Sequence, residues 1–112
     1  MSDFLTMREA AEKLGVVPTR IKQLWAEHDL LKVKQDGKPM VPAECLIEDE
    51  YGWAPLPPLR GTMIMLLDAG FSDEEATDWI MSYQEELGER PIDSLRKQRI
   101  RDVRNAILPL TF

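Results

Sequence analysis

The stretch GVVPTRIKQLWAEHDLLKVKQDGKPMV, residues 15–41, decides the fold expected for this chain. Its first half predicts a short helix. Pro18 suits the first turn, where a residue without an amide hydrogen loses no helical hydrogen bond. Apolar residues then recur at helical spacing, at Ile21, Leu24 and Trp25. We therefore expect an amphipathic helix whose opposite side is open to solvent.

A short β-hairpin is expected directly after this helix. Residues 31–34, Leu-Lys-Val-Lys, alternate apolar and basic, which is the period of a half-buried strand. Asp36-Gly37 is a strong signal for a two-residue hairpin loop. Residues 39–41 would form the return strand, and their proline fits a strand at the edge of a sheet. Residues 42–46 are expected to begin a third short helix.

A first helix is expected before this stretch. Residues 6–9, Thr-Met-Arg-Glu, form a capping-box pattern, and apolar residues follow at helical spacing. Gly15 suits the left-handed residue that ends a helix. Two short helices joined by a tight turn and followed by a basic hairpin make a winged helix-turn-helix. This N-terminal domain is predicted to span residues 1–47.

The remainder of the chain predicts a linker and a helical domain. Residues 48–58 begin with an acidic run and end in a proline-rich segment, and they are expected to form a stiff linker. Residues 59–112 are expected to form a C-terminal helical domain. The predicted fold class is therefore all-α with a small β-hairpin wing, a winged helix-turn-helix followed by C-terminal helices.

Within the C-terminal domain, an apolar helix is expected to run from Leu59 to Ala69 and to stop at Gly70. A second capping box opens at Ser72. The helix that follows is expected to end at Gly88 and to bury Ala76, Trp79, Ile80 and Tyr83. Trp25 and Trp79 are both expected in the core. Trp53, in the predicted linker, is a candidate to hold the two lobes together.

The composition argues against several classes of protein. The chain has 112 residues, of which 44% are hydrophobic and 30% charged, as in ordinary globular domains. Its apolar runs are too short to cross a bilayer, and its first residues lack a signal-peptide pattern. One His and one Cys argue against a zinc site, and no nucleophile–base pair is evident. We expect a cytoplasmic, non-enzymatic protein without metal or cofactor, with His28 at the end of the second helix.

The net charge of -6 is unevenly distributed along the chain. Residues 1–47 have a net charge of zero, residues 48–89 of -10 and residues 90–112 of +4. A polyanion responds to local potential within roughly 8–10 Å at physiological salt, so the total does not exclude DNA binding. Residues 16–41 hold five Lys or Arg against three acids. We expect modest affinity from one copy, with the segment 48–89 facing away from the duplex.

The exposed side of the second helix carries residue types that read DNA. Arg can pair with guanine and Gln with adenine, while Thr and Lys suit phosphate. The predicted major-groove residues are Thr19, Arg20, Lys22 and Gln23. The hairpin would neutralise the flanking backbone with Lys32, Lys34 and Lys38. The expected partner is double-stranded DNA. The competing interpretation is a plain helical domain in which these side chains are only solvated.

The basic segment 96–104 allows three interpretations. It is a solvated face that pairs with acids of residues 48–89, a second DNA contact, or a surface for a partner protein. Its basic residues are Arg96, Lys97, Arg99, Arg101 and Arg104. The apolar residues Ile100, Val103 and Ile107 recur along the last helix. This stripe must be buried within the chain or against a second copy, and it is the candidate homodimer surface.

Residues 5–46, LTMREAAEKLGVVPTRIKQLWAEHDLLKVKQDGKPMVPAECL, resemble the helix-turn-helix module of small actinobacterial DNA-binding proteins. They are more distantly similar to winged domains of the MerR and excisionase type. Residues 59–96, LRGTMIMLLDAGFSDEEATDWIMSYQEELGERPIDSLR, resemble the C-terminal domain that the same actinobacterial family pairs with this module. The resemblance implies DNA binding, a small helical C-terminal domain and no cofactor. Transcriptional regulation or nucleoid organisation would follow.

Part of the C-terminal half also resembles the toxin-binding domain of a class of antitoxins. The matching elements are Trp79 and residues 91–95, Pro-Ile-Asp-Ser-Leu. The basic segment 96–104 departs from that pattern. This similarity gives the alternative function, an antitoxin-like module that binds a partner protein through its C-terminal helices.

Overall fold

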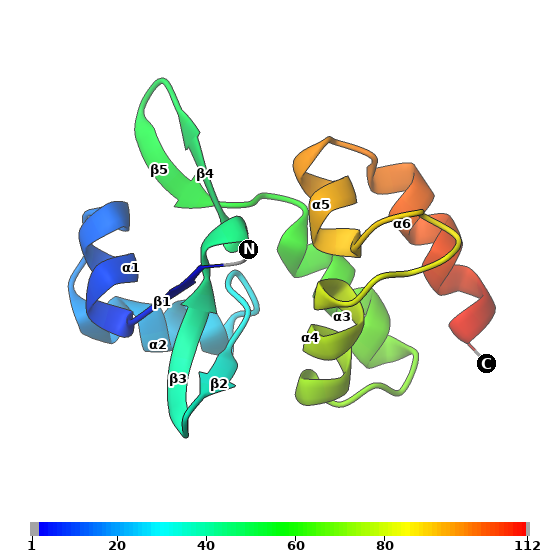
Figure 1. Cartoon of the computed structure of the whole chain (residues 1–112), viewed down its shortest axis with the longest axis horizontal. Helices are drawn as coiled ribbons and strands as arrows, with labels where there is room; N and C mark the ends of the chain where they lie inside the picture. Colours follow the sequence, from blue (N-terminus) through cyan, green and yellow to red (C-terminus); the bar gives the residue numbers. More distant parts are fainter. Residues whose placement is uncertain (1–2, 112) are drawn as a thin grey trace. The chain divides into compact units, whose positions relative to one another are not determined.

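The computed structural model describes residues 3–111. The chain forms two compact units, Met1–Pro57 and Pro58–Phe112, whose elements are coloured along the sequence in Figure 1. The first unit holds the helix-turn-helix and short strands, and the second is helical. The expected fold class, a winged helix-turn-helix followed by C-terminal helices, is confirmed.

The first unit is organised around two helices, α1 (Met7–Leu14) and α2 (Pro18–Ala26). The capping box opens α1 as expected, because Thr6 Oγ1 accepts from the Glu9 amide and Glu9 Oε1 accepts from the Thr6 amide. Gly15 ends α1 in the left-handed conformation, with φ of 70°. The two helices pack through small and branched apolar residues that are buried, Ala10, Ala11, Ile21 and Leu24.

The wing is the hairpin of β2 (Val33–Gln35) and β3 (Lys38–Pro42). Asp36 and Gly37 form its two-residue loop, with φ of 52° and 79°. Positive φ at both positions matches the twist of the flanking strands, which confirms the turn expected from Asp36-Gly37. Figure 1 shows this hairpin beside β1 (Phe4–Leu5).

β3 is the central strand of a sheet with the order β1-β3-β2, so its expected position at an edge is wrong. The register explains why Pro39 is tolerated there. Gln35 and Lys38 close the loop as a hydrogen-bonded pair, so the next pair, Lys34 and Pro39, is a non-hydrogen-bonded one. The backbone nitrogen of residue 39 therefore points away from β2, so the lack of an amide hydrogen in proline costs no hydrogen bond to that strand. On the other side β1 pairs only with Val41 and Pro42.

Residues 42–55 differ from the expected short helix and linker. A single 3-10 turn, η1 (Ala43–Cys45), leads into a second hairpin of β4 (Leu46–Asp49) and β5 (Gly52–Pro55). Asp49 Oδ1 accepts from the Tyr51 amide at 2.8 Å and fixes the loop. The prolines do not prevent this strand, because Pro55 lies at its end and β5 pairs with β4 alone.

The tryptophans of the first unit lie at its margins rather than in its centre. Trp25 is half-buried, and its Nε1 donates to the Leu31 carbonyl at 2.9 Å, which fixes the chain that follows α2. The ring of Trp53 in β5 lies 3.8 Å from the Lys13 ammonium of α1. This cation–π contact is made within the first unit, where Trp53 joins the hairpin to a helix.

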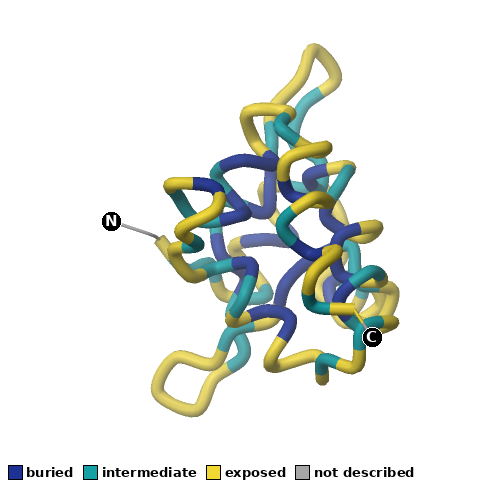
Figure 2. The backbone as a smooth tube through the Cα atoms, turned by 90° about the vertical axis from the view of Figure 1, so that its right-hand side faces the viewer, coloured by how far each residue is buried: buried dark blue, intermediate teal, exposed yellow. Residues whose placement is uncertain are grey.

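The second unit contains α3 (Leu59–Asp68), α4 (Asp73–Met81), α5 (Pro91–Arg96), α6 (Ile100–Ile107) and a final 3-10 turn, η2 (Leu108–Leu110). Ser72 caps α4 with a reciprocal bond to Glu75, as expected. Figure 2 colours the backbone by burial, with buried residues in dark blue. The most deeply buried side chains of this unit come from all four α-helices, among them Leu59, Leu66, Ile80, Ile92, Leu95, Val103 and Ile107.

Two expectations about α4 are wrong. The helix ends at Met81, because Ser82 is extended with φ of -109° and ψ of 149°. Tyr83 therefore lies outside the helix and is 65% exposed, and Trp79 is only half-buried. Gly88 ends a turn of the following loop, with φ of 70°.

The apolar stripe of α6 is not available as a homodimer surface. Val103 is 1% exposed and Ile107 is fully buried. α6 packs against α3 and α5 of its own unit. Only Ile100, at the start of the helix, is exposed, at 37%. The stripe is thus buried within the chain, the first of the two expected outcomes.

Candidate nucleic-acid interface

The solvent side of α2 carries three of the four residues predicted for the major groove. Thr19, Lys22 and Gln23 are exposed, opposite the buried Ile21 and Leu24. This follows from the helical repeat, which places residues three or four apart on one face. Arg20 lies at the flank of this face and is half-buried. The helix starts at Pro18, so these side chains occupy its first two turns.

Arg20 is held by neighbours on its own helix. Its Nη1 donates to Gln23 Oε1 at 2.8 Å and lies 3.9 Å from Glu27 Oε1. Glu27 is a weak partner, because an exposed ion pair contributes little in water. The bond to Gln23 joins the two residues expected to read bases. To contact a base edge, Arg20 and Gln23 would either break this hydrogen bond or keep it and bind the base together.

The wing presents its lysines in different directions. Lys34 lies across from Pro39 and Lys38 across from Gln35, in neighbouring pairs of the ladder. Because successive pairs face opposite sides of a sheet, the two exposed lysines do not form one row. Lys32 lies just before β2, with its ammonium 5.4 Å from the centre of the Trp25 ring.

The lysines of α2 and the wing take part in none of the ion pairs found within residues 3–111. Lys22, Lys32, Lys34 and Lys38 are all exposed. Their charges are therefore not neutralised by a carboxylate of the chain, and they can meet an external anion without breaking a salt bridge.

Sequence reasoning missed an apolar residue at the start of α2. Val17 is the N-cap residue of α2 and is 66% exposed. A search for polar and basic types passes over it. The signal that could have found it is Pro18, because a proline in the first helical position makes the preceding residue the N-cap.

His28 follows the last residues of α2 and has φ of 65°, so it ends the helix in a left-handed conformation, in the place expected for it. Within residues 3–111, no group of three or more His, Cys, Asp or Glu side chains could hold a metal ion. No helix in the same range is long and apolar enough to span a membrane.

In the second unit, part of the basic segment is joined to an acid of the same unit. Glu89 accepts from Lys97 Nζ at 2.5 Å, from Arg99 Nη1 at 2.8 Å and from the hydroxyl of the buried Ser94 at 2.5 Å. The hydrogen bonds from Lys97 and then Ser94 lower the pKa of Glu89 to about 2. The interpretation that this segment pairs with residues 48–89 is thus confirmed for Lys97 and Arg99.

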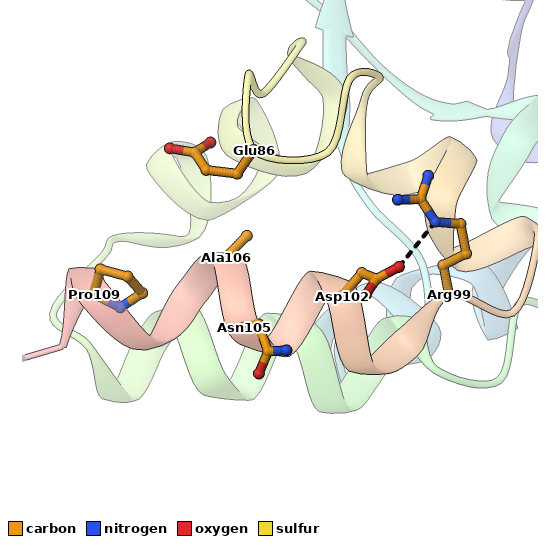
Figure 3. A pocket seen from close by; sticks show the side chains of 6 residues that line it. All are labelled: Glu86, Arg99, Asp102, Asn105, Ala106 and Pro109. Atoms are coloured by element: carbon orange, nitrogen blue, oxygen red, sulfur yellow. Dashed lines mark hydrogen bonds and ion pairs between the residues drawn. The ribbon is translucent and has the colours of Figure 1, made fainter.

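A shallow pocket of about 250 Å³ lies beside this cluster. Figure 3 shows its lining residues, Glu86, Arg99, Asp102, Asn105, Ala106 and Pro109. Arg99 Nε donates to Asp102 Oδ2 at 3.0 Å. These two charged side chains bind each other, and the remaining polar lining residues are Glu86 and Asn105.

Comparisons with known proteins give one matching family model for each of the two units of the chain. The family model described as "DNA-binding protein Rv2175c, wHTH domain" matches residues 2–46. The model described as "Rv2175c C-terminal domain of unknown function" matches residues 56–106. No curated protein matches the chain.

The solved NMR structure of Rv2175c has the same fold. It aligns with a TM-score of 0.82 and 22% sequence identity, over 98% of this chain and 82% of that chain. At this identity the likeness concerns the fold alone. The two family models, in contrast, match most of the sequence in the same order as the two units. The chain belongs to the Rv2175c family.

Proposed function

We propose that this protein binds double-stranded DNA through α2 and the wing, and that it regulates transcription. One observation carries the proposal. α2 leaves the face with Thr19, Lys22 and Gln23 open, next to a wing whose lysines are exposed and take part in no ion pair within the described chain. The family description as a DNA-binding protein supports the same conclusion. The place of action would be the cytoplasm, where bacterial DNA lies.

The roles of the residues follow from their chemistry. A helix in the major groove brings its N-terminal residues to the base edges. Arg20 and Gln23 would read bases, since both offer the two-point hydrogen bonds that distinguish guanine and adenine. Thr19 and Lys22 would lie nearer phosphate. Lys32, Lys34 and Lys38 would contact the backbone beside the groove, which fixes the register without reading sequence.

Specific binding is proposed to need two copies on one site. A single unit with a small excess of positive charge makes few phosphate contacts, and each contact adds only a modest, salt-dependent amount to affinity. The surface that would join two copies is not the buried stripe of α6. Light scattering of the protein with and without its preferred duplex tests this part, and a monomer in both samples would contradict it.

The test of DNA binding is a selection from a random duplex library, followed by titration of the enriched duplex and a shuffled duplex at one fixed salt concentration. We expect tighter binding to the enriched duplex. Absence of binding to every duplex would overturn the proposal and leave the partner-binding interpretation. For regulation, a reporter promoter that carries the enriched site should change its output when the protein is expressed, and an unchanged output would contradict that role.

A further inference from the structure

Val17 is an unusual residue for its position. It is the N-cap of α2, it is 66% exposed, and its side chain makes no capping hydrogen bond. N-cap positions favour Ser, Thr, Asp and Asn, whose oxygens accept from the free amides of the first turn. Thr6 and Ser72 do this for α1 and α4. At position 17 the chain instead holds a branched apolar side chain in water.

The position of Val17 places it where a base edge would be met. The first turn of α2 is the part that enters the major groove in the proposed function, and Val17 immediately precedes it. Its exposed neighbour Thr19 lies within the same turn. In the major groove the apolar feature of a base pair is the 5-methyl group of thymine, which side-chain methyl groups contact.

We propose that Val17 is a specificity-determining residue that contacts the 5-methyl group of a thymine. The inference rests on the proposed function, because it assumes that α2 lies in the major groove. Val17 adds apolar discrimination to the polar readout by Arg20 and Gln23. The neighbouring Val16 is only 36% exposed and lies one residue farther from the helix, so it serves as the matched control.

The experiment removes single methyl groups from the DNA. Each thymine of the enriched duplex is replaced in turn by deoxyuridine, which pairs with adenine identically but lacks the 5-methyl group. Burial of one methyl is worth roughly fourfold in affinity. We expect wild-type protein to lose about fourfold at one position of each half-site. Val17→Ala should show a weaker preference for the thymine duplex than wild type, because its one methyl group reaches less far, whereas Val16→Ala should keep the wild-type preference.

A second variant separates recognition from folding. Val17→Ser removes both methyl groups and supplies an N-cap oxygen, so it should melt at a higher temperature than wild type and still lack the methyl preference. Equal binding of wild type to all uracil duplexes would overturn the role of Val17 and leave DNA binding intact. An unchanged methyl preference in Val17→Ala or Val17→Ser would do the same. Absence of binding to every duplex would overturn both proposals.

Discussion

The helix α2 with its wing and the segment 96–104 both carry basic residues, but the two regions hold them differently. Lys22 and the wing lysines take part in no ion pair within residues 3–111. In the second unit, Lys97 and Arg99 both bind Glu89. The apolar sides of the two helices are alike, since Ile21 and Leu24 of α2 and Val103 and Ile107 of α6 are all buried.

The difference shows why net charge is a poor guide to polyanion binding. The chain has a net charge of -6, and residues 90–112 have the larger local excess, +4. On charge alone, the basic tail would be the preferred DNA surface. In the basic tail, the ion pairs of Lys97 and Arg99 with Glu89 lower the positive charge that is open to an external anion. The wing has fewer basic residues, but none of its lysines is in an ion pair within the described residues. Lys22 and the three wing lysines all remain outside the ion pairs of the described residues, whereas the basic segment loses Lys97 and Arg99 to Glu89 and keeps the exposed Arg101 and Arg104.

The largest expected effect concerns the buried face of α6. Ile107→Ala should lower the free energy of unfolding by about 2–5 kcal/mol, because it leaves a cavity in the core of the second unit. Leu108→Ala, at a neighbouring residue that is 57% exposed, should change it by less than about 0.5 kcal/mol. Urea unfolding of both variants measures the difference. If Ile107→Ala left stability unchanged but weakened self-association, the stripe would belong to a dimer surface after all.

The next effect concerns base readout by α2. Arg20→Ala should cost about 1–3 kcal/mol on the enriched duplex and much less on a shuffled one, because a base contact carries that difference. Gln23→Ala should act likewise at a neighbouring base pair. Lys22→Ala is the matched control, since a phosphate contact weakens binding to both duplexes alike. Fluorescence titration at one salt concentration compares them.

Loss of the Arg20–Gln23 hydrogen bond could imitate part of this result. The double variant Arg20→Ala with Gln23→Ala distinguishes the two cases, because residues in contact show a coupling energy that independent sites lack. Equal losses on the enriched and shuffled duplexes in Arg20→Ala would show that Arg20 reads no base.

A smaller effect is expected on the salt dependence of binding, and it should differ between Lys34, which is in no ion pair within the described residues, and Lys97, which is paired with Glu89. Lys34→Ala should weaken binding to all duplexes and reduce the slope of log K against log salt by about 0.9, the contribution of one phosphate contact. Lys32→Ala and Lys38→Ala should behave likewise. Lys97→Ala should leave the slope unchanged, since its ammonium binds Glu89. A reduced slope in Lys97→Ala and a constant one in the wing variants would reverse the comparison between the two regions.

Local signals in the sequence were sufficient for the helix-turn-helix and the wing. Thr6, Ser72 and the Asp36-Gly37 loop each act through neighbours in the sequence, so their pattern predicts their structure. The second hairpin was missed because its strands, Leu46–Asp49 and Gly52–Pro55, lack clear alternation and carry acids and prolines that suggest a linker. Pairing between strands decides such a segment, and a single-strand pattern cannot show it.

The site itself was predictable only as a set of residue types. Helical spacing indicates that Thr19, Lys22 and Gln23 share an open side, but it does not show which side chains bind each other. The Arg20–Gln23 bond depends on rotamers. The opposite directions of Lys34 and Lys38 depend on the ladder register, and the capture of Lys97 by Glu89 depends on how a loop folds back.

The smallest expected effect is on the pH dependence of stability, through Glu89 and its partners in the basic segment. The pKa of Glu89 is lowered from its ordinary value of 4.5 to about 2, first by the hydrogen bond from Lys97 and then by that from Ser94. A depressed carboxyl pKa means that the ionised form stabilises the folded state. This stabilisation is complete above pH 4.5, the ordinary value, and is lost as the pH falls towards 2.

We therefore expect the melting temperature of wild type to fall across that window, with a smaller fall in Glu89→Gln, which has no carboxylate to protonate. The amide keeps an acceptor for Ser94 but cannot neutralise Lys97 or Arg99, so at neutral pH this variant should melt below wild type. Glu85→Gln is the control, at an exposed residue of the same loop, and it should follow the wild-type curve. Thermal melts at intervals of pH measure all three. Parallel curves for wild type and Glu89→Gln would show that Glu89 contributes no pH-dependent stability, and the basic segment would then be as free to meet an external anion as the wing.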